Sequence, residues 1–429
     1  MQPVQFDRST GIKCRRAGIL RASVFLIIFG TAKYVERDSF HQDESVLQSA
    51  VEVSFVTLGT CLAIAAAIYH RVVPRVHSAY FLVLLPLCLA VVFSFRSWDP
   101  TLSFGRGALL IMISASTVAL LRTFGVRPLI SSFITAYIIL IGLGLLIATI
   151  APNNFPLMLH DPGEEGLRLR LHILKIHPIA LADTCATCLI VSAIFRGWWI
   201  RCFRVIFATC LILTVTRTSI VFGLPIYVAA EIVSIGWHRA RFKPAHVIGV
   251  LILIPAMLGI GMIFAFSDWA PIDNFRADFL HVLDATESNS TLNGRTVLWA
   301  MLISDLSFEN FYGYGVNGAR YYLRTVNPWF GHSHNSILES IYIAGYAGAA
   351  LTVFGLGWSF RRLVCERDLP DRRIFALTLC YIFVAGMMNP AWYETSSLIV
   401  ISVVCAGPGG SEIQERHAAR LRALKQNRP

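Results

Sequence analysis

The sequence predicts an all-α integral membrane protein, a single polytopic domain over residues 1–429 with about 12 transmembrane helices. Of the 429 residues, 55% are apolar and only 15% are charged, and the mean hydropathy is +0.61. A soluble domain of this length would need more polar residues to cover its core. The apolar residues also gather in long blocks, and about 20 such residues in a helix cross a hydrocarbon core of about 30 Å.

Twelve apolar blocks are the expected helices, and those numbered first, fourth, seventh, eleventh and twelfth are short. They lie at residues 18–33, 47–69, 78–95, 106–121, 128–150, 178–195, 203–216, 219–235, 246–266, 336–359, 374–388 and 392–407. Residues 1–32 also have features of a cleavable signal peptide, since basic residues and a short apolar run precede Gly30-Thr31-Ala32. Cleavage there would remove one helix without changing which side the later loops face.

Lys and Arg residues predict the orientation, because cytoplasmic loops of membrane proteins carry an excess of them. With a cytoplasmic N-terminus, the segments expected inside hold 25 of the 37 basic residues, although the two longest loops lie outside. The alternation of basic and less basic segments predicts that both termini are cytoplasmic. The formal charge of +11 then reflects the excess of Lys and Arg in cytoplasmic segments. The basic residues are spread over short segments, so we expect no continuous basic face that would bind nucleic acid.

Two outward loops are long, at residues 151–177 and 267–335. The second is a large periplasmic loop before the tenth helix, and loops of that length are usually functional. Within it, residues 296–306 predict a short amphipathic helix at the membrane surface, and Gly313-Tyr314-Gly315 predicts a turn. No internal repeat of the kind found in many transporters is evident.

The ten cysteines predict neither a disulfide framework nor a zinc site. All lie in expected helices or in cytoplasmic segments, and the two long outward loops contain none. Cys185 and Cys188 have the spacing of a metal-binding pair, but they lie inside an apolar block without a second pair.

Four acidic residues lie inside or beside apolar blocks, where ionisable groups are costly. Glu52 and Glu231 are near the ends of their helices, so we expect both to reach the membrane interface. Asp183 is expected to pair with a basic residue of the outward surface. Ser336 and Glu339 have the spacing of a capping box at the start of the tenth helix.

Three cationic or proton-binding groups are expected on the outward side. His334, with His332 close by, lies in the segment Gly331–Glu339 at the start of a membrane helix, where backbone N–H groups favour an anion. Arg295 lies in the large loop, in the run Asn-Gly-Arg-Thr-x-x-Trp, and Arg217 lies in a tight turn between two helices. Arginine suits a diphosphate because its planar fork stays charged and binds two oxygens at once.

This arrangement resembles the O-antigen ligase and O-antigen polymerase superfamily of bacterial membrane glycosyltransferases, most closely its exopolysaccharide polymerases. The features that match are the arginine turn, the "GRT…W" run followed by "GYG", and the "HSHNSxLE" start of the next helix, over roughly residues 200–360. The resemblance implies metal-independent, cofactor-free glycosyl transfer from a polyprenyl-diphosphate-linked oligosaccharide at the periplasmic face of the bacterial inner membrane.

By the same resemblance, Arg217 and Arg295 would hold the diphosphate and His334 would lie at the reaction centre. His334 is chosen over His332 because Asn335 and Leu338 follow it as in the family pattern. His332 and Asn335 complete the expected substrate-binding set. A chain-length regulator and a flippase are the partners that the family implies. A ligase that transfers glycan to the lipid A core shares this chemistry and is the main alternative.

Two other functions stay open at this point. Glu36-Arg37-Asp38 in the first outward loop would suit a divalent cation, which suggests a metal-dependent glycosyltransferase that uses polyprenyl phosphate sugars. A solvated charge run explains the same residues more simply. A transporter of lipid-linked sugars would show repeats and a charged path through the membrane, and neither is evident in the sequence.

Overall fold

In the computed structural model, the described parts of the chain are mostly helical. The described residues are 8–32, 46–72, 77–97, 99–153, 157–160, 169–174, 176–214, 216, 218–236, 295–306, 311–316, 332–365 and 371–407. The expected ninth block, 246–266, lies outside them, as do most of the large loop and Glu36–Asp38. Every other expected block contains a helix.

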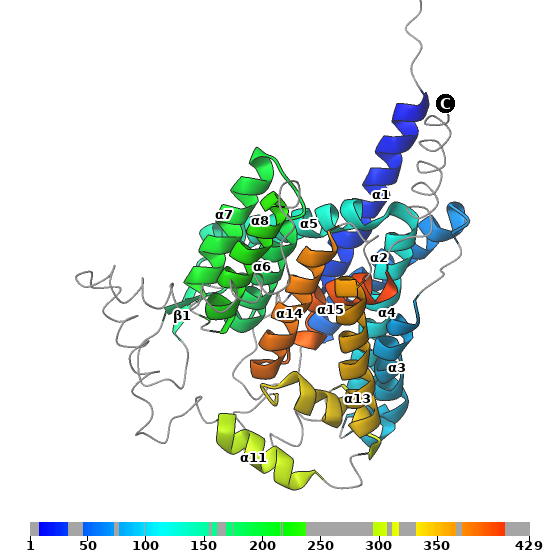
Figure 1. The fold of residues 1–429 in the computed structure, drawn as a ribbon, viewed down its shortest axis with the longest axis vertical. Coiled ribbons are helices and arrows are strands. Elements are labelled where there is room, and N and C mark those ends of the chain that lie inside the picture. Colours follow the sequence, from blue (N-terminus) through cyan, green and yellow to red (C-terminus); the bar gives the residue numbers. More distant parts are fainter. Residues whose placement is uncertain are drawn as a thin grey trace, which may run out of the picture.

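Figure 1 shows the helices as a bundle in which most run in roughly the same direction. The helices are α1 (Arg8–Thr31), α2 (Val46–Tyr69), α3 (Ser78–Val92), α4 (Pro100–Phe124), α5 (Val126–Ile150), α6 (Pro178–Ser192), α7 (Trp198–Leu213), α8 (Leu224–Gly236), α11 (Arg295–Asp305), α13 (Ser336–Cys365), α14 (Arg372–Met388) and α15 (Thr395–Ala406). Three short turns join them: the 3₁₀ turns η1 (Phe93–Arg96) and η4 (Ala391–Tyr393), and the π-helical turn η2 (Ser219–Gly223).

The described helices are those of a membrane protein. Five of them, α2 to α5 and α13, are long and apolar enough to cross a bilayer. Four further apolar stretches are shorter, in α1, α6, η2 with α8, and α15. The cysteines whose side chains the structure describes, all of them after α1, are free thiols.

One departure from an all-helical chain lies in the loop at 151–177. There, β1 (Met158–His160) and β2 (Leu169–Leu171) form an antiparallel hairpin, with Leu159 opposite Arg170. The end of this loop packs back into the bundle, since Ile173 is fully buried and its side chain lies directly against Gly144 of α5. Side chains of this loop thus belong to the main core.

Two carboxylates of the bundle lie next to arginines of neighbouring helices. Glu52 of α2, expected at the membrane interface, is 5% exposed and lies 2.5 Å from the Arg106 guanidinium of α4. Glu231 of α8 lies 2.8 Å from Arg204 of α7. A charge buried in an apolar bundle is stable only with such a partner, which explains how Glu52 is tolerated inside the bundle.

The C-terminus of α15 is closed by two buried arginines from other helices. Arg122, near the end of α4, donates to the Ala406 carbonyl at 2.6 Å, and Arg362, near the end of α13, donates to the Val404 carbonyl at 2.8 Å. The last carbonyls of a helix lack partners within it and carry partial negative charge. Cations that reach them from α4 and α13 therefore hold α15 at this end of the bundle.

Helix α13 is bent at Gly345, and the segment Gly313–Gly315 fills the bend. Gly345 has φ 74° and ψ 178°, which interrupts the helical hydrogen bonds around it. The backbone N–H groups of Tyr314 and Gly315 donate to the Tyr342 and Ile343 carbonyls at 2.7 and 3.0 Å. Gly313 and Gly315, where the sequence predicted a turn, both have positive φ, and their segment closes this bend.

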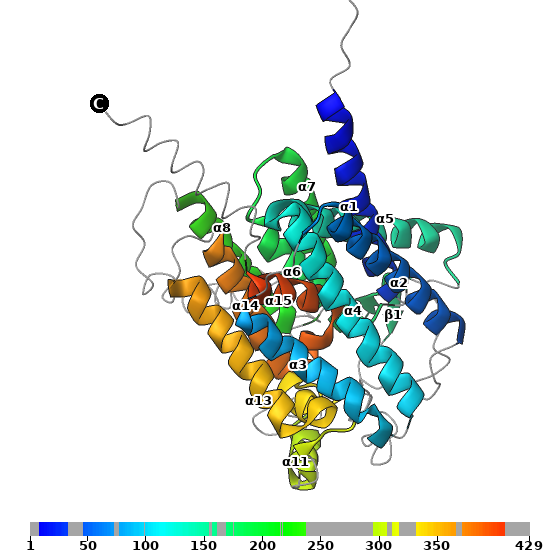
Figure 2. The same cartoon turned by 90° about the vertical axis from the view of Figure 1, so that its right-hand side faces the viewer.

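Figures 1 and 2 show the result, because the start of α13 lies across the lower end of the bundle while the rest runs beside α3. Helix α11 lies across the same lower end. The bend therefore separates a membrane-length stretch of α13 from a short N-terminal part that carries the "HSHNSxLE" motif.

We expect Gly345→Ala to destabilise the protein by more than about 1–3 kcal/mol, the usual cost of a non-glycine residue in such a conformation. An added Cβ would also collide with the Phe311 carbonyl. Gly357→Ala on the same helix is the matched control, because nothing lies within 4 Å of its Cβ. Thermal unfolding in detergent compares them. Equal melting temperatures for the two variants would contradict the proposed role of the bend.

Candidate functional site

Residues His332–Asn335 form a loop, here called the histidine loop, that leads into α13. Its centre is Ser333, which is fully buried. The Ser333 N–H donates to the Glu339 carboxylate at 2.9 Å, and the Ser333 hydroxyl donates to the Asn335 carbonyl at 2.8 Å. Because Glu339 lies in the first turn of α13, the helix holds the loop that precedes it.

Asn335, rather than Ser336, caps α13. Its side-chain oxygen accepts the N–H groups of Ile337 and Leu338 at 2.9 and 3.2 Å, as an N-cap residue does. The expected capping box between Ser336 and Glu339 is therefore wrong. Asparagine caps at least as well as serine, so the helix begins one residue earlier and Glu339 reaches back to Ser333 instead.

His334 has an unusual backbone conformation and lies against His332. Its φ of 51° is in the left-handed region, which few residues other than glycine adopt. Its N–H donates to Nδ1 of His332 at 3.3 Å, and the two ring centroids are 3.9 Å apart. Such conformations cost free energy and persist where the surroundings fix them, often at functional sites. The His332 Nδ1 atom is thus an acceptor for the backbone.

Helix α11 supports the histidine loop from the other side. The Trp299 indole N–H donates to the Ser333 carbonyl at 2.9 Å. Leu298 and Leu302 are buried against Leu338 and Tyr342 of α13, and α11 lies within a residue of the bounds expected for a helix in the large loop. Both polar backbone groups of Ser333 are therefore held, its N–H by Glu339 and its carbonyl by Trp299.

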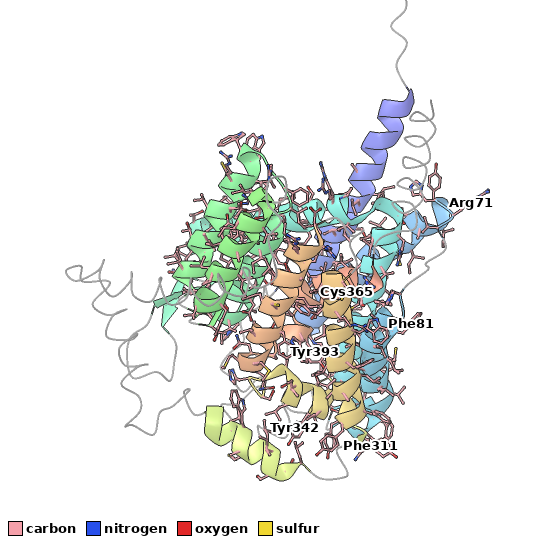
Figure 3. All side chains as sticks on the ribbon, viewed as in Figure 1. Arg71, Phe81, Phe311, Tyr342, Cys365 and Tyr393 are labelled. Atoms are coloured by element: carbon pink, nitrogen blue, oxygen red, sulfur yellow. The ribbon has the colours of Figure 1, made fainter. Side chains whose placement is uncertain are left out.

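Tyr342 locks α11 to α13 at the far end of α11. Its hydroxyl donates to the Leu302 carbonyl and to the Asp305 carboxylate, both at 3.0 Å. Figure 3 labels Tyr342 at the junction between the two helices. The Tyr314 ring stacks on the Tyr342 ring with centroids 6.3 Å apart. Tyr342 therefore contacts both α11 and the segment that fills the bend of α13.

The structure brings some of the expected site residues together and does not describe others. His332, His334 and Asn335 share the histidine loop. Arg295 is the first residue of α11, the helix whose Trp299 holds that loop, although its side chain lies outside the described part. Arg217 also lies outside the described residues. The "GRT…W" and "HSHNSxLE" motifs are thus joined in space by the bond from Trp299 to Ser333.

Sequence reasoning did not single out the connection between α14 and α15, residues 389–394, which borders the site. The Ser336 hydroxyl donates to the Asn389 carbonyl at 2.9 Å, and the hydroxyls of Ser340 and Tyr393 lie 2.6 Å apart. Figure 3 places Tyr393 between α14 and α13. The run Asn-Pro-Ala-Trp-Tyr-Glu, which interrupts two apolar blocks, was the signal in the sequence that could have revealed it.

Asp183 of α6, for which the sequence predicted a basic partner on the outward surface, lies inside the bundle. It is 1% exposed and accepts hydrogen bonds from Ser219, Tyr381 and Asn389 at 2.6, 2.8 and 3.4 Å. Three donors thus converge on one buried carboxylate, which satisfies both of its oxygens.

The described site combines an imidazole pair, a helix N-terminus and a rigid backbone. The N-terminus of α13 carries partial positive charge, and a neutral imidazole can take up a proton. Arrangements of this kind are suited to proton transfer next to a bound anion, provided that the reacting groups are held in place.

Comparison with known families identifies one segment of the chain. Residues 202–353 match the family model described as O-antigen ligase. This segment includes most of α7, then α8, α11, the histidine loop and the bend in α13, so the resemblance seen in the sequence is confirmed where the site is built. No curated protein matches the chain.

We expect Asn335→Ala to lower the free energy of unfolding by about 1 kcal/mol, because α13 loses its N-cap. Asn335→Ser is the matched variant, since it also loses the amide donor that reaches the Met387 carbonyl but keeps a capping oxygen. It should recover more than half of the loss in a chemical or thermal unfolding experiment. Alanine and serine variants of equal stability would show that the cap contributes nothing.

Proposed function

We propose that this protein is a membrane glycosyltransferase that polymerises polyprenyl-diphosphate-linked oligosaccharide repeats into exopolysaccharide. The observation that carries the proposal is the histidine loop. His334 has a left-handed conformation, and the preceding Ser333 is bonded by Trp299 of the "GRT…W" motif and by Glu339 of α13, inside the segment that matches the O-antigen ligase model.

In the proposed reaction, a hydroxyl of the acceptor sugar attacks the anomeric carbon of the donor glycan. The new carbon–oxygen bond forms as the bond to the diphosphate breaks, and polyprenyl diphosphate leaves with the electron pair. The imidazole of His334 takes the hydroxyl proton, and Arg217 and Arg295 stabilise the negative charge that develops on the leaving group. His332 and Asn335 keep the loop in shape, the first through the His334 N–H and the second through the α13 cap. No metal is part of this scheme.

The proposed topology has twelve crossings, with both termini in the cytoplasm and the site at the periplasmic face of the bacterial inner membrane. The two ends of the bundle differ in the way that this topology requires. Arg122 and Arg362 lie together at the end of α4 and α13, whereas the histidine loop lies at the start of α13. A cytoplasmic assignment for the arginine-rich end follows the usual distribution of positive charge.

Ligation of the glycan to the lipid A core is the second candidate, favoured by the description of the matched family model. Polymerase and ligase differ in the acceptor and not in the bond that forms. The proposed donor substrate is therefore a lipid-linked glycan for the polymerase and for the ligase alike. A flippase that delivers the donor and a chain-length regulator are the proposed partners of the polymerase.

We expect His334→Asn to abolish polymer formation while the protein accumulates normally. Asparagine tolerates the left-handed backbone of this position, so the variant removes the imidazole and keeps the loop. Arg217→Ala and Arg295→Ala should have the same effect, because each would remove a positive charge that stabilises the departing diphosphate. Arg201→Ala, an exposed arginine of α7, is the control and should keep full activity. Polymer production by any of the three site variants would remove that residue from the mechanism.

A strain that lacks the gene for this protein distinguishes the two candidate acceptors, a second lipid-linked repeat and the lipid A core. Loss of high-mass exopolysaccharide, with normal lipopolysaccharide and accumulated single lipid-linked repeats, is the expected result. Gel profiles of both glycans and mass spectrometry of the lipid-linked pool measure it. Intact polymer that is missing from the lipid A core would instead identify a ligase, and unchanged glycans of both kinds would contradict the proposed function.

A further inference from the structure

Asp183 joins the two segments that would carry the reaction. Its first oxygen accepts the hydroxyl of Ser219 at 2.6 Å, and Ser219 follows Arg217 by two residues. Its second oxygen accepts the side-chain amide of Asn389 at 3.4 Å. The Asn389 carbonyl in turn accepts the hydroxyl of Ser336, which follows His334 by two residues. One buried carboxylate therefore connects the chain after the arginine turn to the chain after the histidine loop, through Ser219 on one side and through Asn389 and Ser336 on the other.

The turn that presents Ser219 has a special geometry. Ser219–Gly223 is a π-helical turn, a rare feature that is frequent at functional sites. Gly223 lies against Ala186 of α6, so closely that a Cβ on the glycine would lie 2.9 Å from the alanine Cβ. The π-helical turn thus packs against α6, the helix that carries Asp183, at Gly223 as well as at Ser219.

Tyr381 adds a third donor to the same carboxylate. Its ring is fully buried in α14, and its hydroxyl donates to the Asp183 oxygen that also accepts Ser219, at 2.8 Å. A carboxylate in an apolar bundle has a large desolvation cost. Packing of α6, α8 and α14 alone would be served as well by apolar side chains, so the cost calls for a role that packing does not explain.

We infer that Asp183 is a positioning residue, which holds the arginine turn and the histidine loop at the separation that glycosyl transfer requires. It acts through Ser219 on one side and through Asn389 and Ser336 on the other, without contact with substrate. The inference rests on the proposed function. Displacement of a reacting group by about 1 Å can cost about a hundredfold in rate, so loss of part of this connection lowers turnover even when the fold survives.

Two tyrosine variants test the inference with matched chemistry. Tyr381→Phe removes one hydroxyl from the Asp183 cluster. Tyr80→Phe removes one from a second buried cluster, in which Tyr80 lies 3.1 Å from Ser114. Each purified protein, in lipid nanodiscs, is assayed with the lipid-linked repeat that a deletion strain accumulates. We expect Tyr381→Phe to lower kcat about tenfold with little change in KM for the donor, and Tyr80→Phe to leave kcat within twofold of wild type.

A charge exchange provides the rescue. Asn389→Asp places two carboxylates side by side, where both cannot ionise, and should lower kcat more than Tyr381→Phe does. Adding Asp183→Asn restores one carboxylate and one amide with their positions exchanged, and an asparagine oxygen at 183 still accepts Ser219 and Tyr381. The double variant should recover at least tenfold in kcat over Asn389→Asp.

The outcomes separate this inference from the function on which it rests. A wild-type protein that does not elongate or transfer the lipid-linked repeat contradicts the proposed function. An active wild type in which Tyr381→Phe and Tyr80→Phe change kcat equally, at similar melting temperatures, overturns only the role of Asp183. Recovery of melting temperature without recovery of kcat in the double variant would overturn it as well.

Discussion

The insertion of Gly313–Gly315 into the bend of α13 is the contact on which the rest of the site depends. Only glycine at 345 allows the bend, and the two N–H groups donated by the inserted segment replace helical bonds that the bend interrupts. Unpaired backbone groups in an apolar environment are costly, so bend and insertion stabilise each other. Together they direct the start of α13 across the end of the bundle, where α11 can pack on it (Figure 1).

A second constraint is that polar groups inside the bundle come with partners from distant parts of the chain. Glu52 meets Arg106, Arg122 and Arg362 meet the end of α15, and Asp183 meets three donors. In an apolar environment a polar group without a partner is costly, so each such group must lie within hydrogen-bonding distance of its partner. These connections therefore select one arrangement of helices that hydrophobic packing alone would leave open.

The features that sequence patterns predicted well are those with strong local signals. Long apolar blocks predicted the helices, and the amphipathic pattern of residues 296–306 predicted α11 within one residue. Gly313 and Gly315 predicted a turn. The capping box at Ser336 failed because Asn335 and Ser336 both favour caps, and the choice was made by Asn389, which binds the Ser336 hydroxyl. The hairpin at 158–171 has strands of three residues, too short for a periodic signal.

By itself, the sequence determined that the chain is a helical membrane protein and which histidine, arginine and asparagine residues are candidates for chemistry, because hydropathy and motif order are properties of the linear chain. Only the tertiary structure decided that Trp299 and Glu339 hold Ser333 between them, and that Asp183 reaches Ser219, Tyr381 and Asn389. Such contacts join residues far apart in the chain, and they depend on how the helices rotate and tilt, which hydrophobic periodicity does not specify.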